Sequence, residues 1–254
     1  MKNHFKNLNL RLWALALGAA LLTSCASRED IVYFQGTPTE MEAVNYSPTL
    51  QPDDQLVITV SGMDFEATKP FNLTNYYYQS QDETRRLTYL IDEKGEIDYP
   101  ILGKLKLGGM TRVEAMNFMK EKLNEYIVQP GVNIEIVNFK VTVLGEVNRP
   151  GTFQVDNERI TVLEALGLAG DLTINGVRKN VMVIRETPEK KEFHHLDLTS
   201  GDIVNSPVYY LKQNDVVYVE PNKAQINSST YSRNTSIIIS VAGLIITVIS
   251  VLTR

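Results

Sequence analysis

The stretch TRVEAMNFMKEKLNEYIVQPG, Thr111 to Gly131, carries the clearest pattern of a soluble helix in the chain. Thr111 can cap this helix at its N-terminus, and Glu114, three residues later, can reach back to the capping residue. Apolar residues recur at the helical period from Val113 onward, and Pro130 followed by glycine ends the pattern. The stretch therefore predicts an amphipathic helix whose apolar face begins at Val113.

The residues on either side of this helix predict strands. Before it, Pro52 and Asp53 stand in a turn, and alternating apolar residues from Leu56 to Val60 indicate a half-buried strand. A further turn separates two more predicted strands, and VNIEIV (132–137) alternates again after the helix. We therefore predict a first small domain of strands with one helix over residues 47–137.

A second unit opens with the sequence KVTVLGEVNRPGTFQV. Its valines alternate along a strand that ends at Gly145, and Pro150 followed by Gly151 suits the two central positions of a type II turn. Thr161 begins a second capping box, and further strand patterns follow that helix. These features predict a second mixed domain over residues 138–222.

The N-terminus has basic residues followed by an apolar run too short to cross a bilayer, which predicts a signal peptide over residues 1–24. Leu22 stands three residues before Cys25, with small residues between them, which resembles the lipobox of bacterial lipoproteins. A chance cysteine in an ordinary secreted protein is the alternative. Cys25 is the single cysteine of the chain, so no internal disulfide can form and lipidation is its expected role. The segment 25–46 predicts a tether.

The C-terminus carries a second apolar run. After a polar linker, 223–235, residues 236–253 contain no charge and reach the lower limit of length for a membrane-spanning helix; a buried core element is the alternative. Small and polar residues recur there at helical spacing and predict a stripe for helix packing or pore lining, unless they reflect only the usual composition of membrane helices: Ser236, Ser240, Gly243, Thr247 and Ser250. The predicted fold class is α+β, with two small mixed domains followed by a single C-terminal transmembrane helix.

Charge and composition argue against several functions. The formal net charge is −5, and loss of residues 1–24 with their three basic residues leaves −8, which argues against nucleic-acid binding. Two histidines lie beyond the signal peptide, the adjacent pair His194 and His195, which in a strand point to opposite faces and suit a metal poorly. No nucleophile with a base and no phosphate-binding loop stands out. We expect no enzymatic activity, no cofactor and no metal.

Two segments carry a resemblance to a known family. LQPDDQLVITV, Leu50 to Val60, is similar to the opening of a polysaccharide-export domain, with Asp53 where glycine is usual, and LGEVNRPGTF, Leu144 to Phe153, is similar to a soluble-ligand-binding β-grasp (SLBB) domain. This order of domains resembles the outer-membrane polysaccharide export lipoproteins of the Wza type. The likeness covers roughly 46–221 and includes one β-grasp unit where larger members have more.

The resemblance implies a homo-oligomeric ring that is lipid-anchored at Cys25 in the outer membrane, with most of the chain in the periplasm. Its C-terminal helices would together form a pore for capsular or exopolysaccharide, and its partner would be an inner-membrane polysaccharide copolymerase or tyrosine kinase. The alternative expectation is a monomeric membrane-anchored lipoprotein that binds a saccharide or a protein partner through its β-grasp domain.

Overall fold

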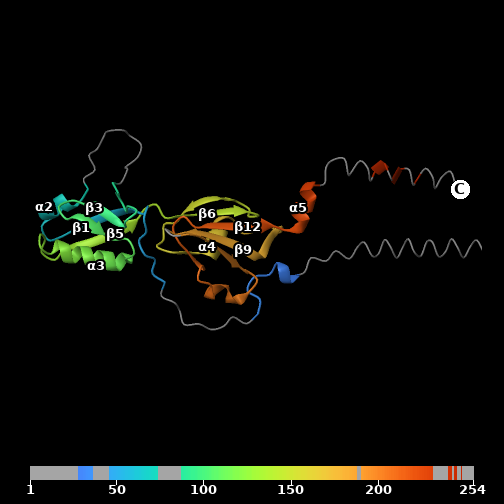
Figure 1. Ribbon diagram of the computed structural model, residues 1–254, viewed down its shortest axis with the longest axis horizontal. Coiled ribbons are helices and arrows are strands. Elements are labelled where there is room, and N and C mark those ends of the chain that lie inside the picture. Colours follow the sequence, from blue (N-terminus) through green and yellow to red (C-terminus); the bar gives the residue numbers. More distant parts are fainter. Residues whose placement is uncertain are drawn as a thin grey trace, which may run out of the picture.

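The structure, a computed structural model, describes residues 28–36, 46–73, 87–187 and 190–230, together with positions 240, 241, 243, 244 and 247. Its buried side chains form two hydrophobic clusters. The cluster from Leu50 to Ile134 defines what we call the first domain, and the cluster from Phe139 to Val219 defines the second domain. Figure 1 shows the two domains next to each other along the long axis, and Ile136 packs against both clusters.

The first domain is built on strand β1, the middle strand of a three-stranded antiparallel sheet. Leu56, Ile58 and Val60 are buried on one face of β1, as their alternation with polar residues predicts. Strand β1 pairs along most of its length with β5 but only at its first two residues with β2. The elements of this domain are β1 (Gln55–Ser61), α2 (Phe65–Thr68), η2 (Lys69–Phe71), β2 (Tyr89–Leu90), β3 (Glu96–Tyr99), β4 (Gly103–Lys106), α3 (Arg112–Leu123) and β5 (Gly131–Ile136).

Helix α3 begins where the sequence predicts. The Thr111 side chain accepts a hydrogen bond from the Glu114 backbone N–H at 3.3 Å, and the Glu114 carboxylate accepts one from the Thr111 N–H at 2.8 Å, which confirms the capping box. Met119 and Leu123, which follow the expected apolar period, are buried. The prediction was wrong at Val113, which is 58% exposed, because the buried row begins instead at Ala115 and continues to Leu123 at intervals of four residues. Two residues correspond to about 200° around a helix, so Val113 faces away from the core.

The second domain is a five-stranded sheet in the order β10-β9-β12-β6-β7, with the buried residues of α4 packed against it. The pairing of β12 with β6 is parallel and every other neighbouring pair is antiparallel. The elements are β6 (Lys140–Gly145), β7 (Gly151–Gln154), β8 (Ile160–Thr161), α4 (Val162–Leu168), β9 (Gly176–Glu186), β10 (Lys191–Leu196), η3 (Gly201–Asn205), β11 (Tyr210–Leu211) and β12 (Val216–Pro221). The capping box predicted at Thr161 is confirmed, with Glu164 as its partner.

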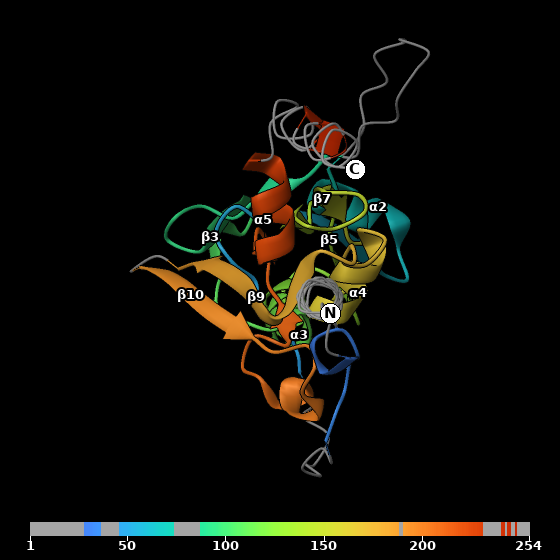
Figure 2. The same cartoon turned by 90° about the vertical axis from the view of Figure 1, so that its right-hand side faces the viewer.

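Two further elements lie at the end of the second domain that is remote from the first domain. These are η1 (Arg28–Asp30), near the N-terminus, and α5 (Lys223–Thr230), which follows β12. Figure 2 looks onto this end of the molecule, so both elements face the viewer. The beginning of segment 28–36 and the end of segment 190–230 therefore lie at the same end of the second domain.

The transmembrane helix predicted over 236–253 requires correction. In the part of the chain that the structure describes, no helix combines the length and the apolar composition needed to cross a membrane. A crossing helix needs about 20 apolar residues, whereas α3 has 12 residues and α5 has eight. The structure supports two mixed α/β domains without the predicted transmembrane helix.

The predicted stripe within the C-terminal run is described only in part. Ser240, Gly243 and Thr247 occupy exposed helical positions, and the Thr247 hydroxyl donates to the Gly243 carbonyl at 2.9 Å. Ser236 and Ser250 lie outside the described residues. The role of the stripe in helix packing stays a prediction.

Candidate functional site

The turn predicted at Pro52 and Asp53 lies at the junction of the two domains. Asp53 takes a φ of 70°, a left-handed conformation that glycine adopts more readily. Its backbone N–H donates to the Ile91 carbonyl at 3.0 Å, and its own carbonyl accepts from the Asn138 side chain at 2.8 Å. The turn thus connects the start of β1 to the residue that leads into the second domain.

Gly145 and Gly151, both predicted turn residues, have different environments. Gly145 ends β6 with a φ of 91°, and a Cβ at this position would overlap the carbonyl group of Val219 on the neighbouring strand. The type II turn predicted at Pro150 and Gly151 was wrong, because Gly151 opens β7 opposite Val143 and lacks the positive φ that this turn requires. Gly145 therefore permits the close approach of β6 and β12, and Gly151 has no such role.

Asn138 joins the two domains through three hydrogen bonds. Its side-chain oxygen accepts from the Gln55 backbone N–H at 2.9 Å and its side-chain nitrogen donates to Asp53, so both bonds reach the first domain. Its carbonyl accepts from the Gln213 side chain of the second domain at 2.8 Å. Sequence reasoning missed Asn138 and Gln213, because no local pattern marks a polar residue whose partners lie more than 70 positions away.

A cleft with both polar and apolar lining opens beside this junction, with a volume of about 240 Å³. Strand β5, the N-terminus of α3 and the loop that follows β7 line it. An ion pair crosses from one domain to the other here, with Arg112 Nε 2.6 Å from Glu158 Oε1. We call it the interdomain cleft, and its polar lining residues are Arg112, Asn133, Glu135, Asp156, Asn157 and Glu158.

Asp54 is the buried carboxylate of the junction. It is 2% exposed, and one oxygen accepts from the Gln51 backbone N–H at 2.8 Å while Oδ1 has no hydrogen-bond partner among the described residues. Burial raises the pKa of Asp54 to about 6, the neighbouring Asp53 adds to the rise, and the bond from Gln51 opposes it. An ionised Asp54 is thus an unfavourable group in the folded protein near neutral pH.

We expect Asp54→Asn to stabilise the protein at pH 7.5. A carboxyl group with a raised folded-state pKa favours folding while it is protonated, and this contribution is lost as the pH rises from 3.8 through about 6. The shift corresponds to a gain on the order of 3 kcal/mol for the variant at neutral pH. Urea unfolding between pH 4 and pH 7.5 measures this gain. Asp98→Asn, an exposed change on β3, is the control, and a variant no more stable than the wild-type chain at pH 7.5 would contradict the argument.

Residues 28–36, which fall inside the predicted tether, lie against the second domain. The Gln35 backbone N–H donates to the Thr199 carbonyl at 2.5 Å, and the Tyr33 hydroxyl donates to the Asp171 carboxylate at 2.5 Å. Burial, with help from Asp171, raises the pKa of Tyr33, so this hydroxyl keeps its proton and remains a donor. This part of the predicted tether is therefore held on the folded domain.

A stack of side chains holds the chain again where it enters the first domain. The ring of Tyr46 lies parallel to that of Tyr210 on β11, with centroids 4.5 Å apart and planes 3° from parallel. The guanidinium carbon of Arg159 lies 5.5 Å from the centroid of the Tyr210 ring. Along the chain, Arg159 directly follows Glu158, which lines the interdomain cleft.

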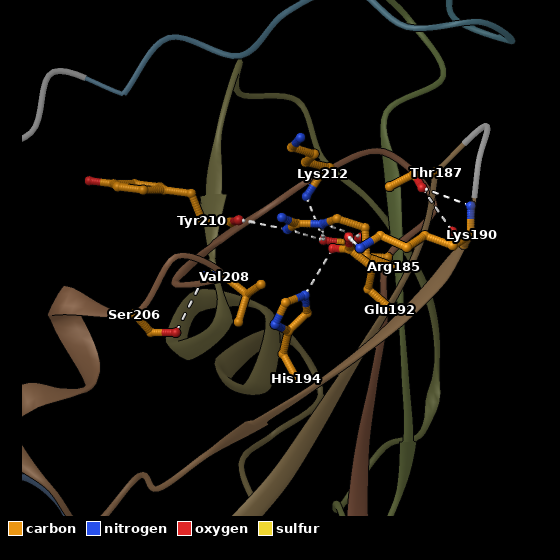
Figure 3. A network of polar contacts seen from close by, with 10 residues as sticks. Arg185, Thr187, Lys190, Glu192, His194, Ser206, Val208, Tyr210 and Lys212 are labelled. Carbon is orange, nitrogen blue, oxygen red and sulfur yellow. Dashed lines mark hydrogen bonds and ion pairs between the residues drawn. The ribbon is translucent and has the colours of Figure 1, made fainter.

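A buried polar network supports the second domain beneath this stack. Arg185 of β9 forms an ion pair with Asp215, with Nη2 2.6 Å from Oδ2, and both side chains are buried. The same guanidinium donates to the Tyr210 carbonyl at 3.1 Å, and the Lys212 N–H donates to Asp215 at 2.7 Å. Figure 3 shows Arg185 directed toward Tyr210 from the sheet. The network fixes β11 against the sheet, which positions Tyr210 for its stack.

The adjacent histidines of β10, whose sequence pattern suits a metal poorly, have separate surroundings. His194 lies 3.1 Å from Glu192, and His195 contacts Asn180 at 2.7 Å, so the two histidines have different partners. Among the described residues, no three histidine, cysteine, aspartate or glutamate side chains are grouped to hold a metal. Cys25 lies outside the described residues, and its lipidation stays a prediction.

Comparison with protein families finds two matches in tandem. Residues 42–137 match the family model for polysaccharide biosynthesis/export proteins, and residues 139–219 match the model for the SLBB domain. The first match covers the first domain and the second covers the second domain. The boundary between the two matches falls at Asn138, the residue that joins the two domains by hydrogen bonds.

Two relatives carry the same name, EPS I polysaccharide export outer membrane protein EpsA. The protein from Ralstonia solanacearum is 24% identical over 139 residues, which is 53% of this chain and 36% of the relative. The protein from Ralstonia nicotianae is 28% identical over 101 residues, which is 38% of this chain and 26% of the relative. The matched region thus spans about a third or less of the length of these relatives.

Proposed function

We propose that this chain is a subunit of an outer-membrane apparatus that exports capsular or extracellular polysaccharide, because its first domain matches the polysaccharide biosynthesis/export family and its second domain matches the SLBB domain. The observation that carries the proposal is the tandem order of an export domain and an SLBB domain, each matched over a complete hydrophobic cluster. The resemblance to the polysaccharide export family is confirmed. The expectation that the chain is not an enzyme agrees with the names of its relatives, which are those of export proteins.

The position of the N-terminal segment supports a lipid anchor that holds the second domain near the membrane. Arg28, the first described residue, follows Cys25 by three positions, so an acylated Cys25 would lie within about 11 Å of it. Arg28 belongs to η1, at the end of the second domain remote from the first domain. In the outer membrane, an anchor at Cys25 would therefore direct the first domain into the periplasm.

A homo-oligomeric ring is the assembly we propose for this subunit. Strand β10 forms one edge of the five-stranded sheet, and β9 is its one partner among the described strands. An edge strand offers unpaired N–H and C=O groups to a neighbouring chain. In such a ring the first domains would face the inner membrane, where a polysaccharide copolymerase or tyrosine kinase is the proposed partner. The proposal does not depend on a membrane-spanning helix.

Complementation of a strain that lacks its own copy of the gene tests the function. We expect the wild-type chain to restore surface polysaccharide and Cys25→Ser to restore far less, because the unacylated chain would leave the outer membrane. Immunoblots of membrane fractions check that both chains are made. Surface polysaccharide that does not depend on the wild-type chain would overturn the function, and full export by Cys25→Ser would overturn the anchor alone.

The mass of the detergent-extracted protein tests the ring. Light scattering with the detergent subtracted is expected to give a discrete multimer, both for the full chain and for a chain ended before Ser236. A multimer after truncation would assign assembly to the two described domains. A monomer in both samples and in a milder detergent would instead favour the alternative function, an anchored lipoprotein that binds a saccharide or a protein partner.

A further inference from the structure

We propose that the interdomain cleft binds one uncharged pyranose unit of the transported polymer, an inference that rests on the proposed export function. The cleft lies between the two domains, and residues of both domains line it. Its volume of about 240 Å³ is below the range of about 300–1,000 Å³ typical of sites for drug-sized ligands. A site of this size suits a single sugar ring.

Hydrogen-bond donors and acceptors in the cleft are without partners among the described residues. Asp156 and Asn157, on the loop after β7, are exposed and make no hydrogen bond with any described residue. Arg112 contacts Glu158 through Nε and the Met116 sulfur through Nη1, so its Nη2 has no partner in the described chain. A carboxylate, an amide and a guanidinium that face one cleft can together accept from and donate to the hydroxyl groups of a sugar.

The charge of the cleft decides between classes of sugar. Glu135, Asp156 and Glu158 are acidic and Arg112 is the one basic residue among the residues that line it. The excess of negative charge disfavours a uronic acid, whose carboxylate would be repelled. The net charge of the chain without residues 1–24, −8, acts in the same direction. We therefore assign the cleft to uncharged sugars.

Two stacked aromatic side chains stand close in sequence to residues that line the cleft. Tyr46 and Tyr210 are both partly exposed, and their neighbours Pro48 and Leu211 line the interdomain cleft and the small cavity beside it. Aromatic rings offer flat apolar surface against which the C–H face of a pyranose can pack. The small cavity also contains Asp54, whose Oδ1 lacks a partner among the described residues and is directed into buried space.

Saturation-transfer NMR on the full-length protein in detergent tests the site. The probes are the methyl pyranosides of glucose, galactose, mannose, N-acetylglucosamine and rhamnose, with that of glucuronic acid as the charged comparison. At least one uncharged glycoside is expected to show saturable binding that exceeds binding of the glucuronide. The absence of saturable binding by all five, or tighter binding of the glucuronide, would overturn the inference.

Matched variants locate the binding. Asp156→Ala is expected to weaken binding of the best glycoside by about tenfold, the effect of one charge-assisted hydrogen bond. Asn157→Ala is expected to weaken it as well, whereas Asp98→Ala, an equally exposed change on β3, should leave it unchanged. Melting curves confirm that each variant is folded. Equal binding by Asp156→Ala, Asn157→Ala and Asp98→Ala would show that the sugar binds elsewhere.

The export assay separates this inference from the proposed function. If no glycoside binds while the wild-type chain restores surface polysaccharide, the cleft assignment fails and the export function stands. If the wild-type chain restores no polysaccharide, the export function fails whatever the glycosides show. Reduced export by Asp156→Ala at a normal protein level is the expected result when both hold.

Discussion

Replacing Gly145 with alanine is expected to destabilise the second domain by more than about 4 kcal/mol, a loss seen only when a buried structural requirement is broken. The added Cβ would overlap the carbonyl oxygen of Val219 and would lie 3.1 Å from the ring of Tyr218. Strands β6 and β12 would have to separate, and they form the parallel pair inside the sheet. The φ of 91° adds strain for any residue with a side chain. Urea unfolding followed by circular dichroism measures the loss.

Variants of two other glycines serve as controls that separate the cost of the overlap with Val219 from the cost of backbone strain. Gly103 has a φ of 67° and open space where a Cβ would stand, so Gly103→Ala should show only the strain, about 1 to 2 kcal/mol. Gly151 has neither a positive φ nor a close neighbour, so Gly151→Ala should change stability by less than about 1 kcal/mol. If Gly145→Ala cost no more than Gly103→Ala, close approach of β6 and β12 would not be the reason for glycine at 145.

Asp215→Ala is expected to cost about 3 to 5 kcal/mol, the usual loss when one member of a buried ion pair is removed. The change leaves the Arg185 guanidinium buried without its counter-charge and removes the acceptor of the Lys212 N–H. The guanidinium that donates to the Tyr210 carbonyl would lose the carboxylate that orients it. Denaturant unfolding measures the loss, and the change in near-ultraviolet circular dichroism from the tyrosines reports on the stack.

A surface pair and a double variant serve as controls for this prediction. Glu186→Gln disrupts the exposed pair between Glu186 of β9 and Lys191 of β10 and should change stability by no more than about 1 kcal/mol. Arg185→Met combined with Asp215→Leu removes both charges and should recover a large part of the loss. Full recovery is not expected, because the Lys212 N–H remains without its acceptor. A single variant as stable as the double variant would contradict the cost assigned to the unpaired arginine.

Local patterns predicted the local structure well. The capping boxes at Thr111 and Thr161 need only residues three positions apart, and the structure contains both. The strand β1 follows from its alternation because one face of a sheet contacts the core. The same reasoning failed at Val113 and Gly151, where the pattern permits an element but the neighbouring chain decides which face or which φ is used.

The candidate site was largely beyond sequence reasoning. Tyr33 is bonded to Asp171, 138 positions away, and Arg112 is paired with Glu158 across the domain junction. Neither pair leaves a periodic signal, since a polar side chain at a loop or helix end fits many surroundings equally well. The apolar C-terminal run shows a different error, in which a pattern predicted too much. Its composition alone suggested a membrane-spanning helix that the described structure does not support.

The amino-acid sequence by itself determined the two mixed domains, their order and their resemblance to polysaccharide-export and SLBB domains, because turns, caps and alternation depend on residues close together in the chain. Only the tertiary structure decided that residues 28–36 are held on the second domain, that Asp54 is buried at the junction, and that a cleft opens beside it. These features arise where segments distant in sequence meet. The free energies of these contacts depend on burial and on the distances between charges, and no local sequence pattern specifies either quantity.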